Sequence, residues 1–207
     1  MRSRRSFLQL AAAGMAAGLA AAVQPDEPRE DFVPLPDYHE LPPECYAQNL
    51  VRPLEIIIHW DGNRQGRDLW LAPITFQTLS LLQQSSHFAV DYKRVWQMLP
   101  MFRTRVQESF GAKGYNWLAI NVELAGVDFD LAENYPPDGE VRLALQLTAQ
   151  LMDFYGIAFE HVVGHYERDP RGDKRDPGAA FMGDFRRQLA VYQASQSPLK
   201  GRALARD

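Results

Sequence analysis

The stretch Leu54-Glu55-Ile56-Ile57-Ile58-His59-Trp60 decides how the rest of the chain is arranged. Its three consecutive isoleucines are β-branched and apolar, so an extended segment of this kind would be buried on both faces. Such a strand lies inside a sheet covered by helices, which indicates an α/β fold. His59 stands at its end, before the turn-forming Asp61-Gly62-Asn63. Sites gather at the strand ends of α/β sheets, although the residue alone also allows a hydrogen-bonded core histidine.

The segments after this strand carry the patterns of further strands and helices. Apolar residues at helical spacing predict helices over residues 74–85, 140–155 and 179–194, the second ending at Gly156. Strand patterns cover residues 118–124 and 161–164, and residues 87–98 predict two short strands joined by a turn at Asp91–Arg94. Residues 101–116 contain Gly111 and Gly114 and are predicted to form a loop. The chain therefore predicts one α/β domain.

Glu123 is an acid inside the apolar strand pattern of residues 118–124. Burying a carboxylate is costly unless it is paired or protonated, so its position needs a reason. Either Glu123 belongs to a functional site, or it lies on an edge strand and faces water.

A second informative stretch is HVVGHYERDPRGDKRDPGAAF, residues 161–181. Within twelve residues it contains His165, Lys174 and Asp176, in a composition typical of a loop. An imidazole nitrogen and a carboxylate oxygen are metal ligands, and a nearby lysine can donate to a developing negative charge. The stretch is therefore a candidate edge of a metal site.

The N-terminal 22 residues have the pattern of a signal peptide: a basic start, an apolar run and Ala20-Ala21-Ala22 before the expected cleavage point. Ser3-Arg4-Arg5-Ser6-Phe7-Leu8 resembles the twin-arginine export signal, which carries folded proteins to the periplasm, the cell envelope or the medium. Residues 23–53 are rich in proline and predict an extended arm around the main domain, residues 54–194. The polar residues 195–207 predict a C-terminal tail. His39 and Cys45 in the arm are interpreted as packed or solvated residues.

Composition excludes several classes of function. The 207 residues are 46% apolar and carry a formal net charge of −4, which gives no general reason to bind nucleic acid. The single cysteine rules out a disulfide within the chain. No membrane span is predicted once the signal is removed, and a monomer is expected.

Three candidate ligands come from separate parts of the chain: His59, His165 and Asp176. Two imidazoles and one carboxylate form a three-ligand zinc set that leaves a fourth position for water. Glu123 would then act as general base or proton shuttle, and Lys174 would stabilise an oxyanion. No two of these ligands form a local motif such as H-E-x-x-H, so spacing alone does not decide the matter.

The order of short motifs along residues 52–192 resembles the type 2 N-acetylmuramoyl-L-alanine amidases. The matching segments are Ile58-His59-Trp60, Ser86-His87-Phe88-Ala89-Val90-Asp91, Asn121-Val122-Glu123-Leu124, Gly164-His165 and Lys174-Arg175-Asp176-Pro177-Gly178-Ala179-Ala180-Phe181. The last of these and the helix followed by Gly-His are the most specific. These amidases are zinc enzymes that share a fold with phage amidase lysozymes and peptidoglycan recognition proteins.

The resemblance implies a role for each matching residue. His59, His165 and Asp176 match the ligands of one zinc ion per chain, Glu123 the catalytic acid/base and Lys174 the oxyanion-stabilising lysine. His87 matches a histidine that supports the site from behind. The implied reaction cleaves the amide between N-acetylmuramic acid and L-alanine in peptidoglycan or muropeptides. The implied fold is a mixed central β-sheet flanked by helices.

The chain also departs from the family pattern. Met101-Phe102-Arg103-Thr104-Arg105-Val106 stands where a W-H-A-G-like segment is usual, and Trp60-Asp61-Gly62 replaces a smaller turn. Two alternatives therefore stay open: a peptidoglycan-binding module without hydrolysis, and a zinc hydrolase of this fold that acts on another amide.

Overall fold

The computed structural model describes residues 37–203, with side chains up to residue 196. The predicted signal peptide and the first part of the arm lie outside the described residues. The strands are β1 (Leu50–Val51), β2 (Glu55–Trp60), β3 (Phe88–Val90), β4 (Val95–Gln97), β5 (Val106–Gln107), β6 (Ala119–Leu124) and β7 (Val162–Gly164). The helices are α1 (Ala72–Leu82), α2 (Asp138–Tyr155) and α3 (Ala179–Ala203), with short 3-10 turns between elements.

The main sheet has five strands in the order β4-β3-β6-β2-β7. Strands β3, β6, β2 and β7 run parallel, and only β4 is antiparallel, to β3. This is the mixed central sheet that the family resemblance implied, and the isoleucine-rich strand β2 lies inside it between β6 and β7. Strands β1 and β5 form a separate antiparallel pair.

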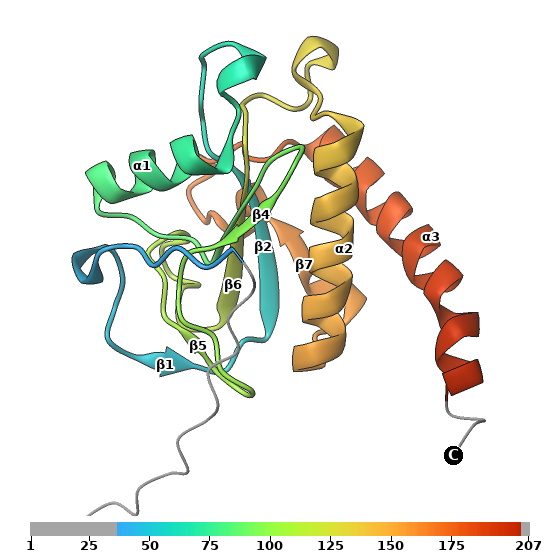
Figure 1. Cartoon of the computed structure of the whole chain (residues 1–207). Helices are drawn as coiled ribbons and strands as arrows, with labels where there is room; N and C mark the ends of the chain where they lie inside the picture. The colour runs from blue at the N-terminus through green and yellow to red at the C-terminus, as the bar shows by residue number, and fades with distance from the viewer. Residues whose placement is uncertain (1–36, 204–207) are drawn as a thin grey trace, which may run out of the picture.

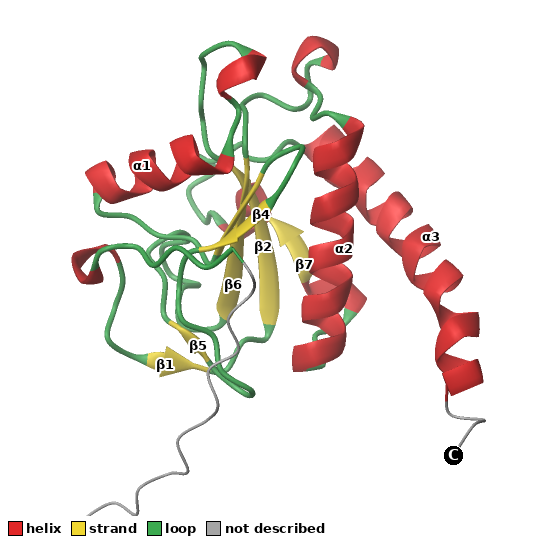
Figure 2. Cartoon of the chain, viewed as in Figure 1, coloured by secondary structure: helices red, strands yellow, loops and turns green. Residues whose placement is uncertain are grey.

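One face of the sheet forms the main hydrophobic core under α2 and α3. Ile56 and Ile58 of β2 and Val122 of β6 are buried there, together with Leu145 of α2 and Phe185 of α3. Figure 1 shows α2 and α3 side by side on one side of the sheet, with α1 on the other, and Figure 2 shows the strands between them. Alternation along each strand therefore leaves the opposite face for other side chains.

That opposite face carries the polar residues. On this face, Ile57 and Ala119 pack against Ala112 of the loop that precedes β6. Side chains two residues apart along a strand share a face. His59 therefore projects from the same face as Ile57, and Asn121 and Glu123 project from the same face as Ala119. Helix α1 packs beside them over β3, where Leu79 contacts a second core cluster containing Ala89, Met98, Leu41 and Cys45.

The described part of the arm runs along the open edge of β4. His39 donates its backbone N–H to the Gln97 carbonyl and Leu41 to that of Met98, and the His39 ring stacks on Trp96 at 3.8 Å between centroids. Cys45 is fully buried. Cys45 is thus buried in the domain, whereas His39 is exposed and contacts the domain through Trp96.

Several details differ from the prediction. Helix α1 begins at Ala72 and ends at Leu82, because Gln83 adopts a left-handed conformation (φ 51°) that stops it before residue 85. The predicted loop 101–116 contains the two-residue strand β5. Helix α3 continues to Ala203, so the predicted tail is wrong for residues 195–203. Within the described residues, no helix is both long and apolar enough to cross a membrane.

Candidate metal centre

Three buried side chains converge on one point on the polar face of the sheet. The Nδ1 atoms of His59 and His165 lie 3.0 Å apart, and Asp176 Oδ2 lies 3.1 Å from the first and 2.9 Å from the second. Among the described residues, this is the only group of three or more such side chains whose ligand atoms gather closely enough to hold a metal ion. The structure therefore brings together the three ligands proposed from the sequence.

The sheet sets the positions of the two histidines. His59 lies near the end of β2, and His165 directly follows β7, whose Gly164 is the register partner of Ile58. Because β2 and β7 are parallel neighbours, their carboxyl ends meet at the same edge of the sheet. The rings consequently meet edge to face, with centroids 4.5 Å apart.

Backbone contacts hold Asp176 against His165, although the two lie eleven positions apart. The N–H of Tyr166 donates to the Asp176 carbonyl at 3.0 Å and closes the base of the loop between the two ligands. The Asp176–Pro177 peptide bond is cis. The loop therefore begins at one ligand and returns to the other.

Gly178 explains why the motif after Asp176 contains glycine. Its φ is +109°, and a Cβ at this position would lie 2.2 Å from Oδ1 of Asp130. The two oxygens of Asp130 accept the N–H groups of Ala179 and Phe181, which lie in the first turn of α3. The same aspartate therefore caps α3 and packs against Gly178, two residues from the ligand.

The hydrogen bonds around His59 show that the cluster fits a metal ion. Asn121 donates one Nδ2–H to Ser109 Oγ at 2.6 Å, and its Oδ1 faces His59 Nε2 at 2.8 Å and accepts a hydrogen bond from the Nε2–H. A neutral His59 then offers a bare lone pair at Nδ1. Bonds of about 2.0–2.1 Å in a tetrahedral site place ligand atoms about 3.3 Å apart, close to the observed spacing.

Charge in the cluster favours a cation. Burial opposes protonation of His59, but the Glu123 and Asp176 carboxylates outweigh it and raise the pKa of His59. Burial lowers the pKa of His165. Burial also opposes ionisation of Asp176, but the neighbouring His165 and His59 imidazoles hold the pKa of its carboxyl well below the ordinary value. The site thus contains an ionised carboxylate facing two nitrogens, which is a donor set for a divalent ion such as zinc.

Glu123 is buried beside this cluster, so the alternative of an edge-strand residue facing water is excluded. Ser86 donates its hydroxyl to Oε1 at 2.9 Å, whereas Oε2 has no hydrogen-bond partner among the described residues. Burial raises the pKa of Glu123 to about 7, with the charge of His59 opposing the shift. A carboxyl group with such a pKa can both take and return a proton near neutral pH.

Two adjoining cavities open over the cluster. The first, of about 190 Å³, is lined by His59, Glu123, His165, Asp176 and Lys174. The second is larger, about 490 Å³, and shares His165 and Lys174 with the first. Lys174 is exposed, and its backbone N–H donates to Asp169 Oδ2 at 2.7 Å. The lysine therefore lies at the junction of the two cavities, on the wall of the cleft.

His87 lies behind the cluster. It is fully buried, its Nδ1 accepts the backbone N–H of Asn121 at 3.0 Å, and its Nε2–H donates to the Gln107 carbonyl at 2.8 Å. Burial lowers its pKa to about 4. Both ring nitrogens are thus occupied. Asn121 itself was not singled out in the sequence, because an asparagine within a strand gives no signal of its own.

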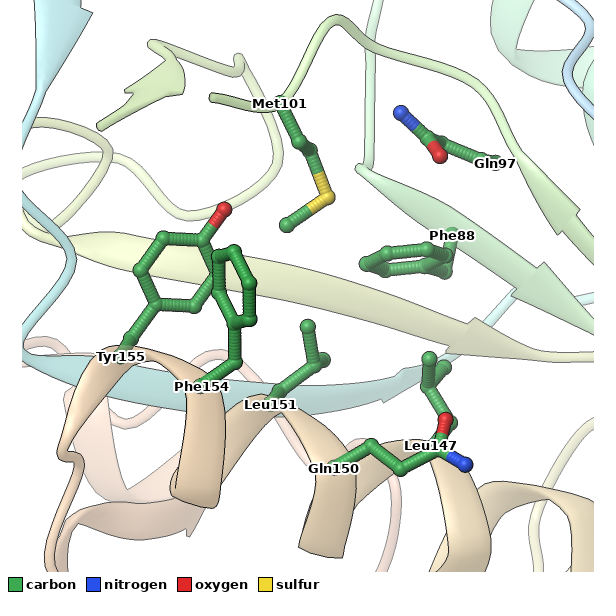
Figure 3. A pocket seen from close by; sticks show the side chains of 8 residues that line it. All are labelled: Phe88, Gln97, Met101, Leu147, Gln150, Leu151, Phe154 and Tyr155. Atoms are coloured by element: carbon green, nitrogen blue, oxygen red, sulfur yellow. The ribbon is translucent and has the colours of Figure 1, made fainter. Parts of the chain in front are cut away.

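A separate apolar pocket of about 150 Å³ lies between α2 and the β3–β4 edge, as Figure 3 shows. Phe88 and Met101 form one side, and Leu151, Phe154 and Tyr155 of α2 form the other. It shares no lining residue with the cleft at the ligand cluster. The apolar pocket therefore lies apart from the ligand cluster.

The sequence pattern of the N-acetylmuramoyl-L-alanine amidase family matches residues 50–179. The chain belongs to this family. The matched range spans β2, β6, β7 and the loop to Asp176, and therefore includes the whole ligand cluster. The protein is a peptidoglycan amidase, and its buried His59, His165 and Asp176 fit the zinc site.

Solved structures share the amidase fold. A mutant endolysin from Bacillus subtilis is 21% identical with a TM-score of 0.56, covering 73% of this chain and 96% of its own. The N-acetylmuramoyl-L-alanine amidase LysC from Clostridium intestinale is 19% identical with a TM-score of 0.52, covering 75% and 99%. A selenomethionine derivative of AmpD is 22% identical with a TM-score of 0.50, covering 76% and 92%. No curated protein sequence matches the chain significantly.

Proposed function

We propose that this amidase uses zinc, held by His59, His165 and Asp176, to hydrolyse the amide between N-acetylmuramic acid and L-alanine. The observation that carries the proposal is the convergence of two imidazole nitrogens and one ionised carboxylate within 3.1 Å of one another, beside a buried acid. When bound, zinc supplies a Lewis acid that polarises a carbonyl and acidifies water.

Glu123 is assigned the proton transfers. Its free Oε2 takes a proton from the attacking water, and the protonated carboxyl group then gives it to the departing amine of L-alanine. Ser86 holds the other oxygen and so fixes the direction of the free one. A pKa of about 7 lets the same group serve as base and then as acid.

Lys174 is assigned to stabilise the negative charge that develops on the carbonyl oxygen. Lys174 lines both cavities, as does the proposed ligand His165. A cation placed where charge develops lowers the barrier more than it strengthens substrate binding.

The larger cavity is assigned to the stem peptide. Lys113, Arg171 and Lys174 line it, while its one acid, Asp169, accepts backbone N–H groups of Arg171 and Lys174. Stem peptides carry carboxylates, so a basic wall complements them. Lys113→Ser should raise KM for muropeptides and leave kcat unchanged, because uniform binding is lost.

The deciding experiment incubates the purified protein with muropeptides, with zinc or with a chelator, and identifies products by mass spectrometry. Free stem peptide should appear with zinc and disappear with chelator. Intact muropeptide that stays bound without cleavage would instead support the binding-module alternative. Cleavage at another amide would support the broader hydrolase alternative.

Export through the twin-arginine pathway is proposed as well. The Arg4-Arg5 pair and the apolar run that follows support it, and a substrate in the cell envelope requires passage across the membrane. The double substitution Arg4→Lys, Arg5→Lys should retain the precursor in the cytoplasm, as measured by cell fractionation. Export that persists unchanged would assign the signal to the general secretory route.

A further inference from the structure

The buried amide of Asn121 connects the metal centre to the loop that precedes β6. It is fully buried on the polar face of the sheet, and its side chain lies between His59 Nε2 (2.8 Å) and Ser109 Oγ (2.6 Å). We propose that Asn121 is a positioning residue that fixes the tautomer and ring orientation of His59, so that Nδ1 is the nitrogen offered to the metal. The proposal rests on the ligand set assigned above.

The direction of each hydrogen bond follows from the donors available. The Asn121 amide nitrogen can only donate, and it donates to Ser109 Oγ. The amide oxygen can only accept, so His59 must carry its proton on Nε2. A neutral imidazole has one N–H, so Nδ1 keeps its lone pair toward His165 and Asp176. A partner of this kind also holds the ring plane, which sharpens the geometry of a metal ligand.

Asn121 is itself held on both sides of its backbone. Its N–H donates to His87 Nδ1 at 3.0 Å, and its carbonyl accepts the backbone N–H of His87 at 2.9 Å. The His87 ring is anchored in turn by the Gln107 carbonyl at 2.8 Å. The family-like histidine at position 87 therefore acts on the centre through Asn121 rather than by touching the ligands.

The loop before β6 closes over the amide at Gly111. A Cβ on Gly111 would lie 3.1 Å from Cγ of Asn121 and 2.8 Å from the Ser85 carbonyl, so the backbone approaches closely here. Ser109, which orients the amide, lies two residues earlier and is fully buried. The loop that precedes β6 thus supplies, at Ser109, the hydrogen-bond partner of the Asn121 amide nitrogen.

Two substitutions separate positioning from packing. Asn121→Leu keeps the size of the side chain and removes the acceptor, and Asn121→Asp keeps an acceptor for the Nε2 proton. Loss of a partner of this kind typically weakens metal binding about 10–100-fold. We expect Asn121→Leu to show that loss in zinc affinity, measured by competition with a chromogenic chelator, and Asn121→Asp to bind within a few-fold of wild type. Urea unfolding of the metal-free variants is the control for folding.

A direct measurement of the tautomer needs neither metal nor activity. Two-bond proton–nitrogen correlation NMR on the metal-free wild-type protein at about pH 9, above the usual histidine pKa of about 6.5, should show His59 protonated at Nε2. An Nδ1–H tautomer there would overturn the proposal, as would wild-type zinc affinity in Asn121→Leu. If the wild type bound no zinc, the proposed ligand set would be wrong. The NMR measurement would still test the tautomer of His59, because it is made on the metal-free protein.

Discussion

Glu123 is the register partner of His59: the two residues lie side by side on the parallel strands β6 and β2 and project from the same face of the sheet. A rigid pair of central strands therefore sets the distance between the proposed base and the first ligand. The base is held by the sheet, while two of its partners in the cleft, Asp176 and Lys174, come from a loop.

Replacing Glu123 by Gln should leave zinc binding intact and lower kcat about 10²–10⁴-fold, because the amide cannot exchange a proton with water. Zinc content is measured by atomic absorption and kcat on muropeptides. Glu133→Gln is the matched control, since Glu133 is exposed. A wild-type kcat in Glu123→Gln would show that this residue does not carry out the proton transfers.

Asp176→Ala should abolish stoichiometric zinc binding, because it leaves two nitrogens without the anionic ligand. Asp173→Ala changes an exposed acid of the same loop, whose carboxylate pairs with Arg171, and should bind zinc normally. Zinc titration after dialysis compares the two. One zinc per chain retained by Asp176→Ala would contradict the ligand set.

Lys174→Met should lower kcat about 10²–10³-fold with little change in KM or zinc affinity, because the cation acts on charge that develops in the transition state. Lys93→Met serves as control, since Lys93 is exposed and its ammonium lies over the Tyr92 ring at 4.7 Å. Steady-state kinetics on a muropeptide series make the comparison. A variant in which only KM rises would reassign Lys174 to substrate binding.

Gly178→Ala should destabilise the fold by at least about 1–3 kcal/mol, because the new methyl group meets Asp130 at a positive φ. It should also weaken zinc binding, since Asp176 lies two residues away. Gly172→Ala has a positive φ but nothing within 4 Å, so its cost should be smaller and zinc affinity unchanged. Urea unfolding and zinc titration test both. Equal behaviour of the two variants would refute the role of the Asp130 contact.

Glu140 should make the protein less stable as the pH rises. It is fully buried on α2, neither carboxyl oxygen has a hydrogen-bond partner among the described residues, and burial raises its pKa well above the ordinary value of 4.5. Asp61 and Asp91 reinforce the shift, and the nearby Ala125 backbone N–H and the Arg67 charge oppose it. The folded protein then retains a proton that the unfolded chain releases above about pH 4.5, so stability falls by up to about 1.4 kcal/mol per pH unit from there upward.

Glu140→Gln removes this titration. Its free energy of unfolding relative to wild type should therefore rise between pH 5 and pH 8, as measured by urea unfolding at the two pH values. Glu133→Gln should show no such trend, because that residue is exposed. A difference between Glu140→Gln and wild type that does not change with pH would show that Glu140 is ionised in the folded protein.

The sequence was informative wherever one local pattern determines a structure. The isoleucine run of β2 and the amphipathic pattern of α2 each lie within one element, so their periodicity predicts them. Strand β5 has two residues, too few to show a period, and it forms only by pairing with β1. Helix α3 passes its predicted end although Pro198 and Gly201 oppose a helix, so local composition gave no signal for this extension.

The candidate site was predictable as a set of residues and not as a geometry. His59, His165 and Asp176 stand far apart in the chain, and only the order of the parallel strands brings the histidines together. Motif resemblance supplied their identity. Asn121 could not be identified from the sequence, because its role depends on contacts with Ser109 and with His59, which lies 62 positions away. Such a relay exists only once the sheet has formed.

The backbone bond from Tyr166 to Asp176 has an evolutionary consequence. Because it ties the two ends of the loop, residues 170–173 at the loop tip can change in length or composition while the ligands at its base stay in place. Pro170 and Arg171 help to form the wall of the larger cavity. Mutations at the loop tip can therefore reshape this wall without disrupting the metal ligands. Substrate range can therefore drift by small steps in a lineage whose chemistry remains constant.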